Sequence, residues 1–255
     1  MVATDIRKNA RKALKGKWNK GAIIAFIVIL VSVGINLLAW KLQENVILVN
    51  VISAIYVLIG VPLSIGVVYG FLELKRKKDS KIFDFLKLTF KNFAKSWAVS
   101  WMIILKMILP IICVAVAIIL YATLMFTSNE ISFGFMLLGV AVFMAAIVYA
   151  VVIGLLYVLA YYIAYDHPEM GIRQVVNESA RLMRGHRGDY FVLMLSFLGW
   201  AILCVLTVGV GFIWLAPYMQ TAMICFYEEV IKLDKKSKKE TKTEKVEETK
   251  EDNKE

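Results

Sequence analysis

Long apolar runs alternate with short basic segments along the chain. The apolar runs lie at residues 21–40, 46–72, 97–126, 131–165 and 190–227, and at most one charged residue interrupts any of them. Each run is long enough to span a membrane, since about 20 apolar residues cross a bilayer as a helix. The pattern therefore predicts an all-α fold, a polytopic bundle of membrane helices.

The last of these runs, Tyr190–Tyr227, is too long for a single crossing. Gly209 and Gly211 lie near its middle, and glycine commonly marks the point where a helix ends and the chain turns. We expect two short helices that turn at these glycines. About six spans in three hairpins result, at 21–40, 46–72, 97–126, 131–165, 190–206 and 212–228.

A basic segment with the spacing of an amphipathic helix precedes each hairpin. The first lies in the cytoplasmic segment 1–20, and the others cover 80–96 and 168–184. Their apolar stripes predict helices that lie on the inner leaflet. For 80–96 the predicted stripe is Ile82, Leu86, Thr89, Phe90, Phe93 and Trp97. The expected headgroup contacts are Arg11, Lys12, Lys77, Lys87, Lys91, Arg181 and Arg184.

Charge and composition support this topology. Sixty per cent of the residues are hydrophobic, which excludes an ordinary soluble domain. Of the 30 Lys and Arg residues, all but Lys41 and Lys106 fall in four clusters, at 1–20, 73–95, 166–189 and after Tyr227. The positive-inside rule then places both termini in the cytoplasm. We expect anionic lipid, rather than nucleic acid, to be the partner of these charges, with a membrane-protein partner or a second copy also possible.

Helix ends and breaks are marked by particular residues. Asp166 and Pro168 resemble a capping residue and the first turn of the helix that Gly185 ends. Pro62, Pro110 and Pro217 interrupt apolar runs, and Gly66-x-x-x-Gly70 is a close-packing pattern. The tail, 231–255, is rich in Lys and Glu, which predicts a disordered cytoplasmic segment. The structural motif comprises Asp166, Pro168, Gly185, Gly209, Gly211, Pro217 and Tyr218.

One charged residue, Lys106, falls inside a predicted span. Its ammonium either reaches back to the inner headgroups or forms part of a polar site with Glu228 or Tyr218. The last span is also polar, with Gln220 and Thr221 following Pro217. Such residues either pack short helices together or line a transport site. The candidate intramembrane site is Lys106, Gln220, Thr221 and Glu228.

Catalytic and metal-binding patterns are missing from the sequence. There is no nucleophile elbow, phosphate loop or HExxH motif. His167 and His186 lie at opposite ends of one predicted helix, too far apart for a shared metal. Cys113, Cys204 and Cys225 all fall within apolar runs, where small buried side chains are expected. We therefore predict no enzyme activity, no cofactor and no metal.

Several motifs carry a family resemblance. They are Arg11-Lys-Ala-Leu-Lys-Gly-Lys-Trp18, the Phe83/Phe85 segment, Asp166-x-Pro168, Ser179, Met183-x-Gly185, Gly199-Trp200, Leu206-Thr207-x-Gly209-x-Gly211, Pro217-Tyr218 and Phe226-Tyr227-Glu228. On these motifs, residues 5–230 resemble the bacterial membrane proteins of the domain-of-unknown-function 975 family. The resemblance implies a multi-pass plasma-membrane protein without an established activity. The chain is more loosely similar to membrane domains that accompany glycerophosphodiesterases, but it contains no catalytic domain of that kind.

Two functions are compatible with these features. The first is a non-enzymatic membrane protein that organises lipid or scaffolds partner proteins through its basic helices. The alternative is a small transporter or permease subunit with a site at broken helices around Pro62, Lys106, Pro110 and Pro217. A cavity lined by Lys106, Gln220 or Thr221 would favour transport, and a solid interior would count against it.

Overall fold

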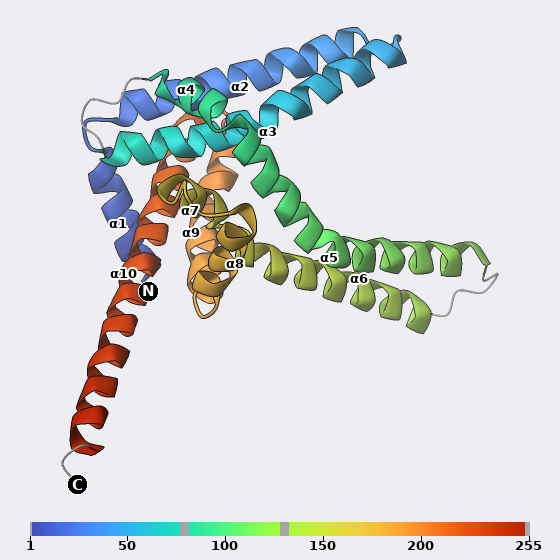
Figure 1. Cartoon of the computed structure of the whole chain (residues 1–255). Helices are drawn as coiled ribbons and strands as arrows, with labels where there is room; N and C mark the ends of the chain where they lie inside the picture. Colours follow the sequence, from blue (N-terminus) through green and yellow to red (C-terminus); the bar gives the residue numbers. More distant parts are fainter. Residues whose placement is uncertain (1, 77–81, 128–132, 253–255) are drawn as a thin grey trace. The chain divides into compact units, whose positions relative to one another are not determined.

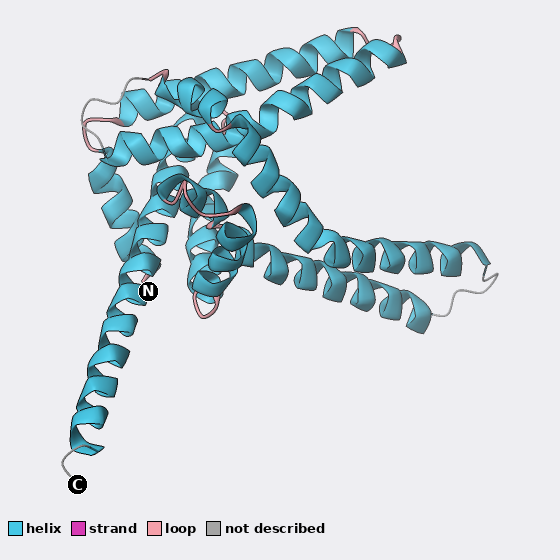
Figure 2. Ribbon diagram, in the orientation of Figure 1, coloured by secondary structure: helices cyan, strands magenta, loops and turns pink. Residues whose placement is uncertain are grey.

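The computed structural model describes residues 2–76, 82–127 and 133–252, which are helical apart from short turns (Figures 1 and 2). The chain divides into two compact units, Met1–Phe93 with Gly188–Glu255, and Ala94–Arg187. The first contains α1 (Ala3–Leu14), α2 (Trp18–Lys41), α3 (Val46–Arg76), α4 (Asp84–Lys91), α9 (Arg187–Leu206) and α10 (Phe212–Asp252). The second contains α5 (Phe93–Thr127), α6 (Phe133–Gly154), the 3₁₀ turn η1 (Leu155–Tyr157), α7 (Ala160–Asp166) and α8 (Ile172–Met183).

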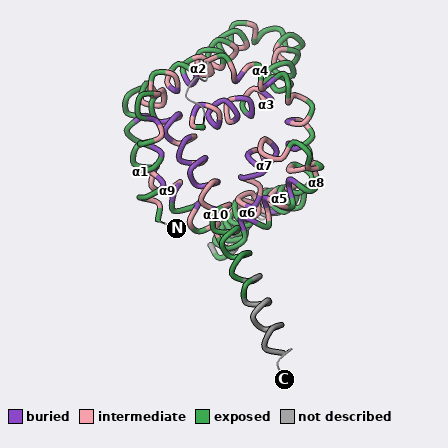
Figure 3. The backbone as a smooth tube through the Cα atoms, turned by 60° about the vertical axis from the view of Figure 1, so that its left-hand side comes forward, coloured by how far each residue is buried: buried purple, intermediate pink, exposed green. Residues whose placement is uncertain are grey.

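In the first unit, α2 and α3 form an antiparallel pair. Near one end, a Cβ atom on Gly21 would approach the Phe71 ring. Farther along, the Tyr56 hydroxyl donates to the Ser32 hydroxyl at 3.3 Å. The residue numbers rise on one helix as they fall on the other, as an antiparallel pair requires. The buried residues of α3 all follow Val61, so only its second half contributes to the core (Figure 3).

The α9–α10 pair is also antiparallel. Tyr190 packs edge-on against Phe226 and Phe197 packs edge-on against Tyr218, with ring centroids 5.4 and 5.1 Å apart. The helices meet again beside the turn, where a Cβ on Gly211 would lie 2.6 Å from a sulfur atom of α9. The break between the helices falls at the glycines where the sequence predicts it.

The second unit is built on an antiparallel contact between α5 and α6. A Cβ on Gly139 would overlap the Tyr121 ring, and one on Gly154 would lie 3.7 Å from the Met107 methyl group. The α5 helix bends along its length, as expected for a helix that contains Pro110 (Figure 1). The segment that follows α6 is not one continuous helix, because η1 and a turn separate α6 from α7.

Two of the three amphipathic helices, α1 and α8, bury their apolar faces against the protein itself. Ile6, Ala10 and Leu14 of α1 are at most 4% exposed, and α1 packs against α10. In α8, Val175, Val176 and Met183 are fully buried, and the helix packs on η1 and α7. The expectation that these apolar stripes dip into the lipid leaflet is therefore wrong for α1 and α8. A helical stripe shows which face seeks an apolar surface, but not which surface covers it.

The α4 helix differs further from the expected segment 80–96. It covers only Asp84–Lys91, because the Asn92 side chain donates to the Leu88 carbonyl and ends the helix. Its buried residues are Phe85 and Thr89, whereas Phe90 of the predicted stripe is 73% exposed. The register is set by α3, whose glycines leave room for these two side chains.

The Asp166 assignment is also wrong. Asp166 is the last residue of α7, and α8 begins only at Ile172, after Gly171. The Gly171 N–H donates to the Gln174 side chain at 3.2 Å, so a glutamine in the first turn satisfies this helix end. Pro168 lies in the turn before the cap rather than in the first turn of α8.

Two further expectations differ from the structure. The helices α3, α5 and α10 continue through Pro62, Pro110 and Pro217, so none of them is broken there. Residues 231–252, expected to be disordered, continue α10 as a helix, in which residues 235–240 are exposed. Ion pairs one helical turn apart accompany it, such as Lys238 with Asp234 at 2.9 Å.

Five helices in the described part of the chain are long and apolar enough to cross a membrane. They are Trp18–Lys41, Val46–Arg76, Phe93–Thr123, Leu137–Asp166 and Arg187–Leu206. The expected sixth span, 212–228, is not among them. The chain is therefore an all-helical protein with several helices suited to a membrane.

Candidate functional site

The four residues of the predicted intramembrane site do not form one described cluster. Gln220, Thr221 and Glu228 lie on α10, whereas Lys106 lies in the second unit and is exposed on α5. Thr221 is 2% exposed, Gln220 is half-buried, and neither cavity described below is lined by them. The structure therefore assigns no shared site to these four residues.

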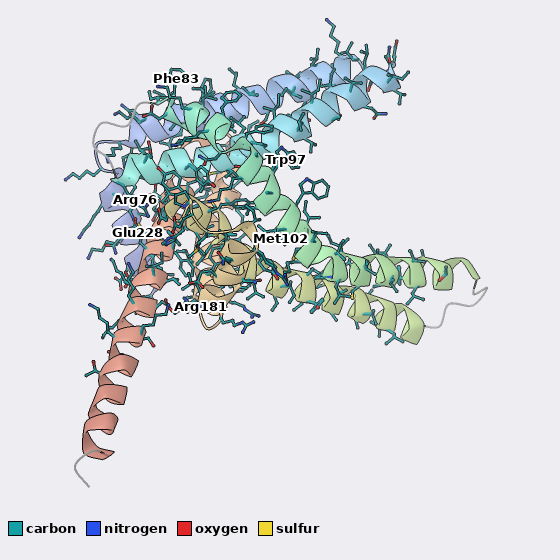
Figure 4. The ribbon with its side chains drawn as sticks, in the orientation of Figure 1. Arg76, Phe83, Trp97, Met102, Arg181 and Glu228 are labelled. Atoms are coloured by element: carbon teal, nitrogen blue, oxygen red, sulfur yellow. The ribbon has the colours of Figure 1, made fainter. Side chains whose placement is uncertain are left out.

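Glu228 instead belongs to an ion cluster with the end of α3. Its carboxylate accepts from Lys75 at 2.6 Å and lies 3.4 Å from Arg76 Nε (Figure 4). The side chain of Lys75 is 15% exposed, so this pair is screened less than a surface pair. Glu228 therefore has basic partners within its own unit. Its suggested pairing with Lys106 stays a prediction.

A second contact fixes the same end of α3. Lys17, in the turn between α1 and α2, donates to the Leu74 carbonyl at 2.5 Å. Carbonyls in the last turn of a helix lack intrahelical partners and carry partial negative charge, so a lysine there is favourable. Together with Glu228, this contact joins the end of α3 to both α10 and the start of α2.

The outward faces of α1, α4 and α8 are cationic. Arg11 and Lys12 of α1, Lys87 and Lys91 of α4, and Arg173 and Arg184 of α8 are exposed, and no carboxylate pairs with them among the described residues. Arg181 differs, because Glu178 binds its guanidinium through two contacts of 2.7 and 2.8 Å. Lys77 lies outside the described residues. Five of the seven expected headgroup contacts are therefore exposed, uncompensated charges.

Exposed aromatic rings accompany the charges of α4. Phe83 is 61% exposed and Phe90 is 73% exposed, and Figure 4 shows Phe83 at the start of α4. Phe83, Lys87 and Phe90 are spaced i, i+4 and i+7, so they share one face of the helix. Sequence reasoning placed Phe90 on the apolar stripe expected to face the inner leaflet, but it did not predict that Lys87 shares this face. Rings and lysines on one exposed face are typical of a helix at a lipid surface.

Polar contacts fix the position of α8 in the second unit. The buried Ser179 hydroxyl donates to the Leu156 carbonyl at 2.8 Å, a carbonyl in the 3₁₀ turn. Lys95 donates to the carbonyls of His167 and Pro168 at 3.2 and 3.1 Å, and so joins the start of α5 to the turn before α8. These contacts hold the cationic face of α8 outward.

The residues with metal or acid–base potential are dispersed. No group of three or more His, Cys, Asp or Glu side chains suited to a metal occurs in the described ranges. His167 Nδ1 lies 2.9 Å from the Glu169 carboxylate. A backbone N–H bond and then the His167 bond hold the pKa of Glu169 below its usual value. Cys204 and Cys225 are buried as expected, whereas Cys113 is exposed on α5, so that prediction is wrong for Cys113.

The predicted glycine motif residues occupy special backbone positions. Gly185 and Gly209 have φ of +93° and +84°, a conformation that side chains disfavour. Gly211 has no room for a side chain beside Cys204. Pro217 and Tyr218 are buried, and Tyr218 packs against both Trp18 and Phe197. These residues form the core that positions α1, α9 and α10.

Comparison with known proteins agrees with the resemblance noted in the sequence. No curated protein and no solved structure matches the chain. A family model described as a protein of unknown function, DUF975, matches residues 1–234, which include both units and the start of the charged extension. The chain therefore belongs to the DUF975 family of proteins of unknown function.

Proposed function

We propose that this protein is a non-enzymatic, six-span protein of the bacterial plasma membrane that binds anionic headgroups of the cytoplasmic leaflet through α1, α4 and α8. The observation that carries the proposal is the division of these helices into a buried apolar face and an exposed, unpaired cationic face. Each lysine or arginine near an anionic surface contributes about 1 kcal/mol of attraction. Organising lipid, or recruiting a membrane partner at such a surface, is the role this arrangement supports.

The topology of the chain supports a shared side for the three helices. In chain order, α1 precedes the apolar helix α2, α4 follows α3, and α8 follows α6 and α7. Each pair of successive membrane crossings returns the chain to the side from which it started. Counting α10 as the sixth span agrees with the antiparallel α9–α10 contacts, which bring Phe226 beside Tyr190 at the start of α9. With six spans, both termini face the cytoplasm.

The mode of binding differs from that of a free amphipathic peptide. A peptide from α1 or α8 would insert its apolar face into lipid, but in the folded chain the protein covers that face. Binding is then electrostatic, except at α4, where Phe83 and Phe90 add apolar contact. Tests must therefore use the full chain rather than isolated peptides.

The full chain extracted with its surrounding membrane by a polymer tests the proposal. The variant K87Q/K91Q/R173Q/R184Q removes exposed cations from α4 and α8, and we expect it to retain a smaller share of anionic lipid than the unaltered chain. K235Q/K239Q, on the exposed extension of α10, is the control and should retain the same lipids as the unaltered chain. Equal lipid composition in all three preparations would reject the proposal.

The transport alternative gains no support from the described cavities. One is lined by residues of α1, α2, α9, α10 and the turn between the last two, and the other by five residues of α5 and α6. Neither involves Pro62, Lys106, Pro110 or Pro217, and the helices that contain these prolines are continuous. The lipid-binding role is therefore favoured.

A further inference from the structure

The first unit contains a cavity of about 400 Å³ bordered by α1, α9 and α10. Its volume falls within the ~300–1,000 Å³ typical of small-molecule sites. The lining is mostly aromatic and aliphatic, with Trp200 on α9 and Trp214 on α10, and the only charged lining residues are Arg7 and Arg11 of α1. The cavity thus combines apolar walls with two positive charges.

The walls come from one face of each helix. Trp200 and Cys204 are spaced i and i+4 on α9, Trp214 and Tyr218 are spaced i and i+4 on α10, and Thr207 and Gly211 lie in the turn between the two helices. Because the helices are antiparallel, these two rows lie opposite each other. Trp200 and Trp214 are 53% and 54% exposed, so the cavity is a groove that opens on the side of the helix pair.

The two arginines are uncompensated. The guanidinium of Arg7 lies 6.0 Å from the centroid of the Phe197 ring, and its Nη1 makes a long contact of 3.5 Å with the Ser196 carbonyl. Its Nε is buried and has no hydrogen-bond acceptor. Arg11 lies one helical turn from Arg7, and no carboxylate pairs with either in the described part of the chain. A buried N–H without an acceptor is costly, and a phosphate oxygen would satisfy it.

We propose that this groove binds one anionic phospholipid, with its phosphate on Arg7 and Arg11 and one acyl chain between Trp200 and Trp214. Arginine matches phosphate because its planar fork donates two parallel hydrogen bonds. The apolar walls exclude a small soluble anion as the best occupant, since such an anion would leave them empty. The proposal deepens the anionic-lipid binding proposed above and rests on it, but it adds a single stoichiometric site to a diffuse surface.

Native mass spectrometry of the full chain measures this site. The chain is titrated with phosphatidylglycerol, or with phosphatidylcholine of the same acyl chains as the neutral probe. We expect one phosphatidylglycerol to bind more tightly than later ones, and R7Q/R11Q to weaken that first binding by about tenfold or more. K235Q/K239Q, which removes the same charge from the exposed extension of α10, should leave the first binding unchanged.

One further variant and one competition experiment distinguish the possible outcomes. The variant R7K/R11K retains both charges without the planar fork. Its affinity for the first phosphatidylglycerol should lie between those of the unaltered chain and R7Q/R11Q, which would show that R7Q/R11Q loses binding rather than folding. Saturating glycerol 3-phosphate should not displace the lipid, and displacement would reassign the groove to a soluble anion. Equal first binding of both lipids, or no effect of R7Q/R11Q, would overturn the proposal.

Fluorescence gives an independent readout in the variant W40F/W97F/W101F, which keeps the three groove tryptophans Trp18, Trp200 and Trp214. Phosphatidylglycerol with brominated chains should quench them saturably, with one equivalent, and R7Q/R11Q should abolish the saturable part. Quenching that rises without saturation would overturn the groove. Loss of lipid enrichment in K87Q/K91Q/R173Q/R184Q alongside unchanged first binding would leave both proposals standing. Unchanged lipid enrichment in that variant, with the first binding still lost in R7Q/R11Q, would reject only the surface role.

Discussion

Gly70 of α3 lies directly against Phe85 of α4, so that a Cβ atom at Gly70 would be 2.6 Å from the Phe85 Cβ. One turn earlier, a Cβ on Gly66 would overlap the Thr89 hydroxyl. The Gly66-x-x-x-Gly70 pattern therefore lets the short basic helix α4 pack closely against α3. Close packing of this kind determines which face of α4 remains outward.

Replacing Gly70 with alanine should displace α4 from α3. Overpacking of this size costs about 1–3 kcal/mol, and we expect a lower melting temperature of the full chain in detergent. A cysteine at position 89 should also become more reactive toward a thiol reagent in the G70A background. The control is G34A, where an added Cβ meets no atom within 4 Å. Equal melting temperatures for G70A and G34A would contradict the packing described.

The ion pair between Lys75 and Glu228 gives a second prediction. Glu228→Gln leaves the half-buried Lys75 without its charged partner, and we expect a loss of about 1–3 kcal/mol in the free energy of unfolding. The exchanged double variant K75E/E228K should recover part of this loss, because the opposite charges remain adjacent. If the double variant lost as much free energy of unfolding as the two single variants together, Lys75 and Glu228 would have no interaction energy.

Ser179 should anchor α8 in the second unit. The variant S179A leaves the Leu156 carbonyl without its buried donor, at a cost of about 1–3 kcal/mol that a thermal melt should detect. S64A is the matched control, since the exposed Ser64 hydroxyl only bonds to its own helix at the Val61 carbonyl. If S179A and S64A had the same melting temperature, the buried hydrogen bond would not hold α8 in place.

The turn between α9 and α10 should depend on the backbone freedom of glycine at one position. Gly209→Ala places a side chain at φ +84°, and we expect a loss of about 1 kcal/mol in stability. Gly199→Ala lies within α9, where an added Cβ meets open space, and should be neutral or slightly stabilising. The difference between the two melting temperatures measures the requirement for a left-handed residue at the turn.

The sequence was sufficient to predict which apolar regions are helical and where the last apolar run turns. Apolar length and the Gly209–Gly211 pair are local signals, and helix formation follows such signals closely. The exposed lysines and arginines of α1 and α4 were predicted for the same reason, because the polar face of a helix is visible in its spacing.

The surfaces that cover the apolar faces could not be predicted. Ile6, Ala10 and Leu14 have the spacing expected of a helix that lies on lipid, yet they pack on the protein. A face covered by lipid and a face covered by protein require the same apolar residues. Phe85, which is not in the predicted stripe, is buried because two glycines of α3, distant in sequence, leave space for it. Asp166 failed as a cap because Gln174 satisfies Gly171 instead. These outcomes depend on tertiary partners that no local pattern names.

The cavity residues were also partly visible in the sequence. Trp200 belongs to the Gly199-Trp200 motif of the last hairpin, but Arg11 was expected to contact headgroups at the membrane surface. Only the packing of α1 against α10 brings Arg7 and Arg11 to the groove. An arginine without a carboxylate partner can be recognised only in the structure, because its recognition requires knowledge of every neighbouring side chain.

The central claim is that unpaired cationic faces concentrate anionic lipid around this protein. The direct measurement is the ratio of anionic to zwitterionic lipid retained by the full chain, compared with the bulk membrane, at about 0.05 M and about 0.5 M salt. The account predicts enrichment of anionic lipid at low salt that falls at high salt, because headgroup contacts at exposed charges are screened. A retained lipid ratio equal to that of the bulk membrane at low salt would contradict it.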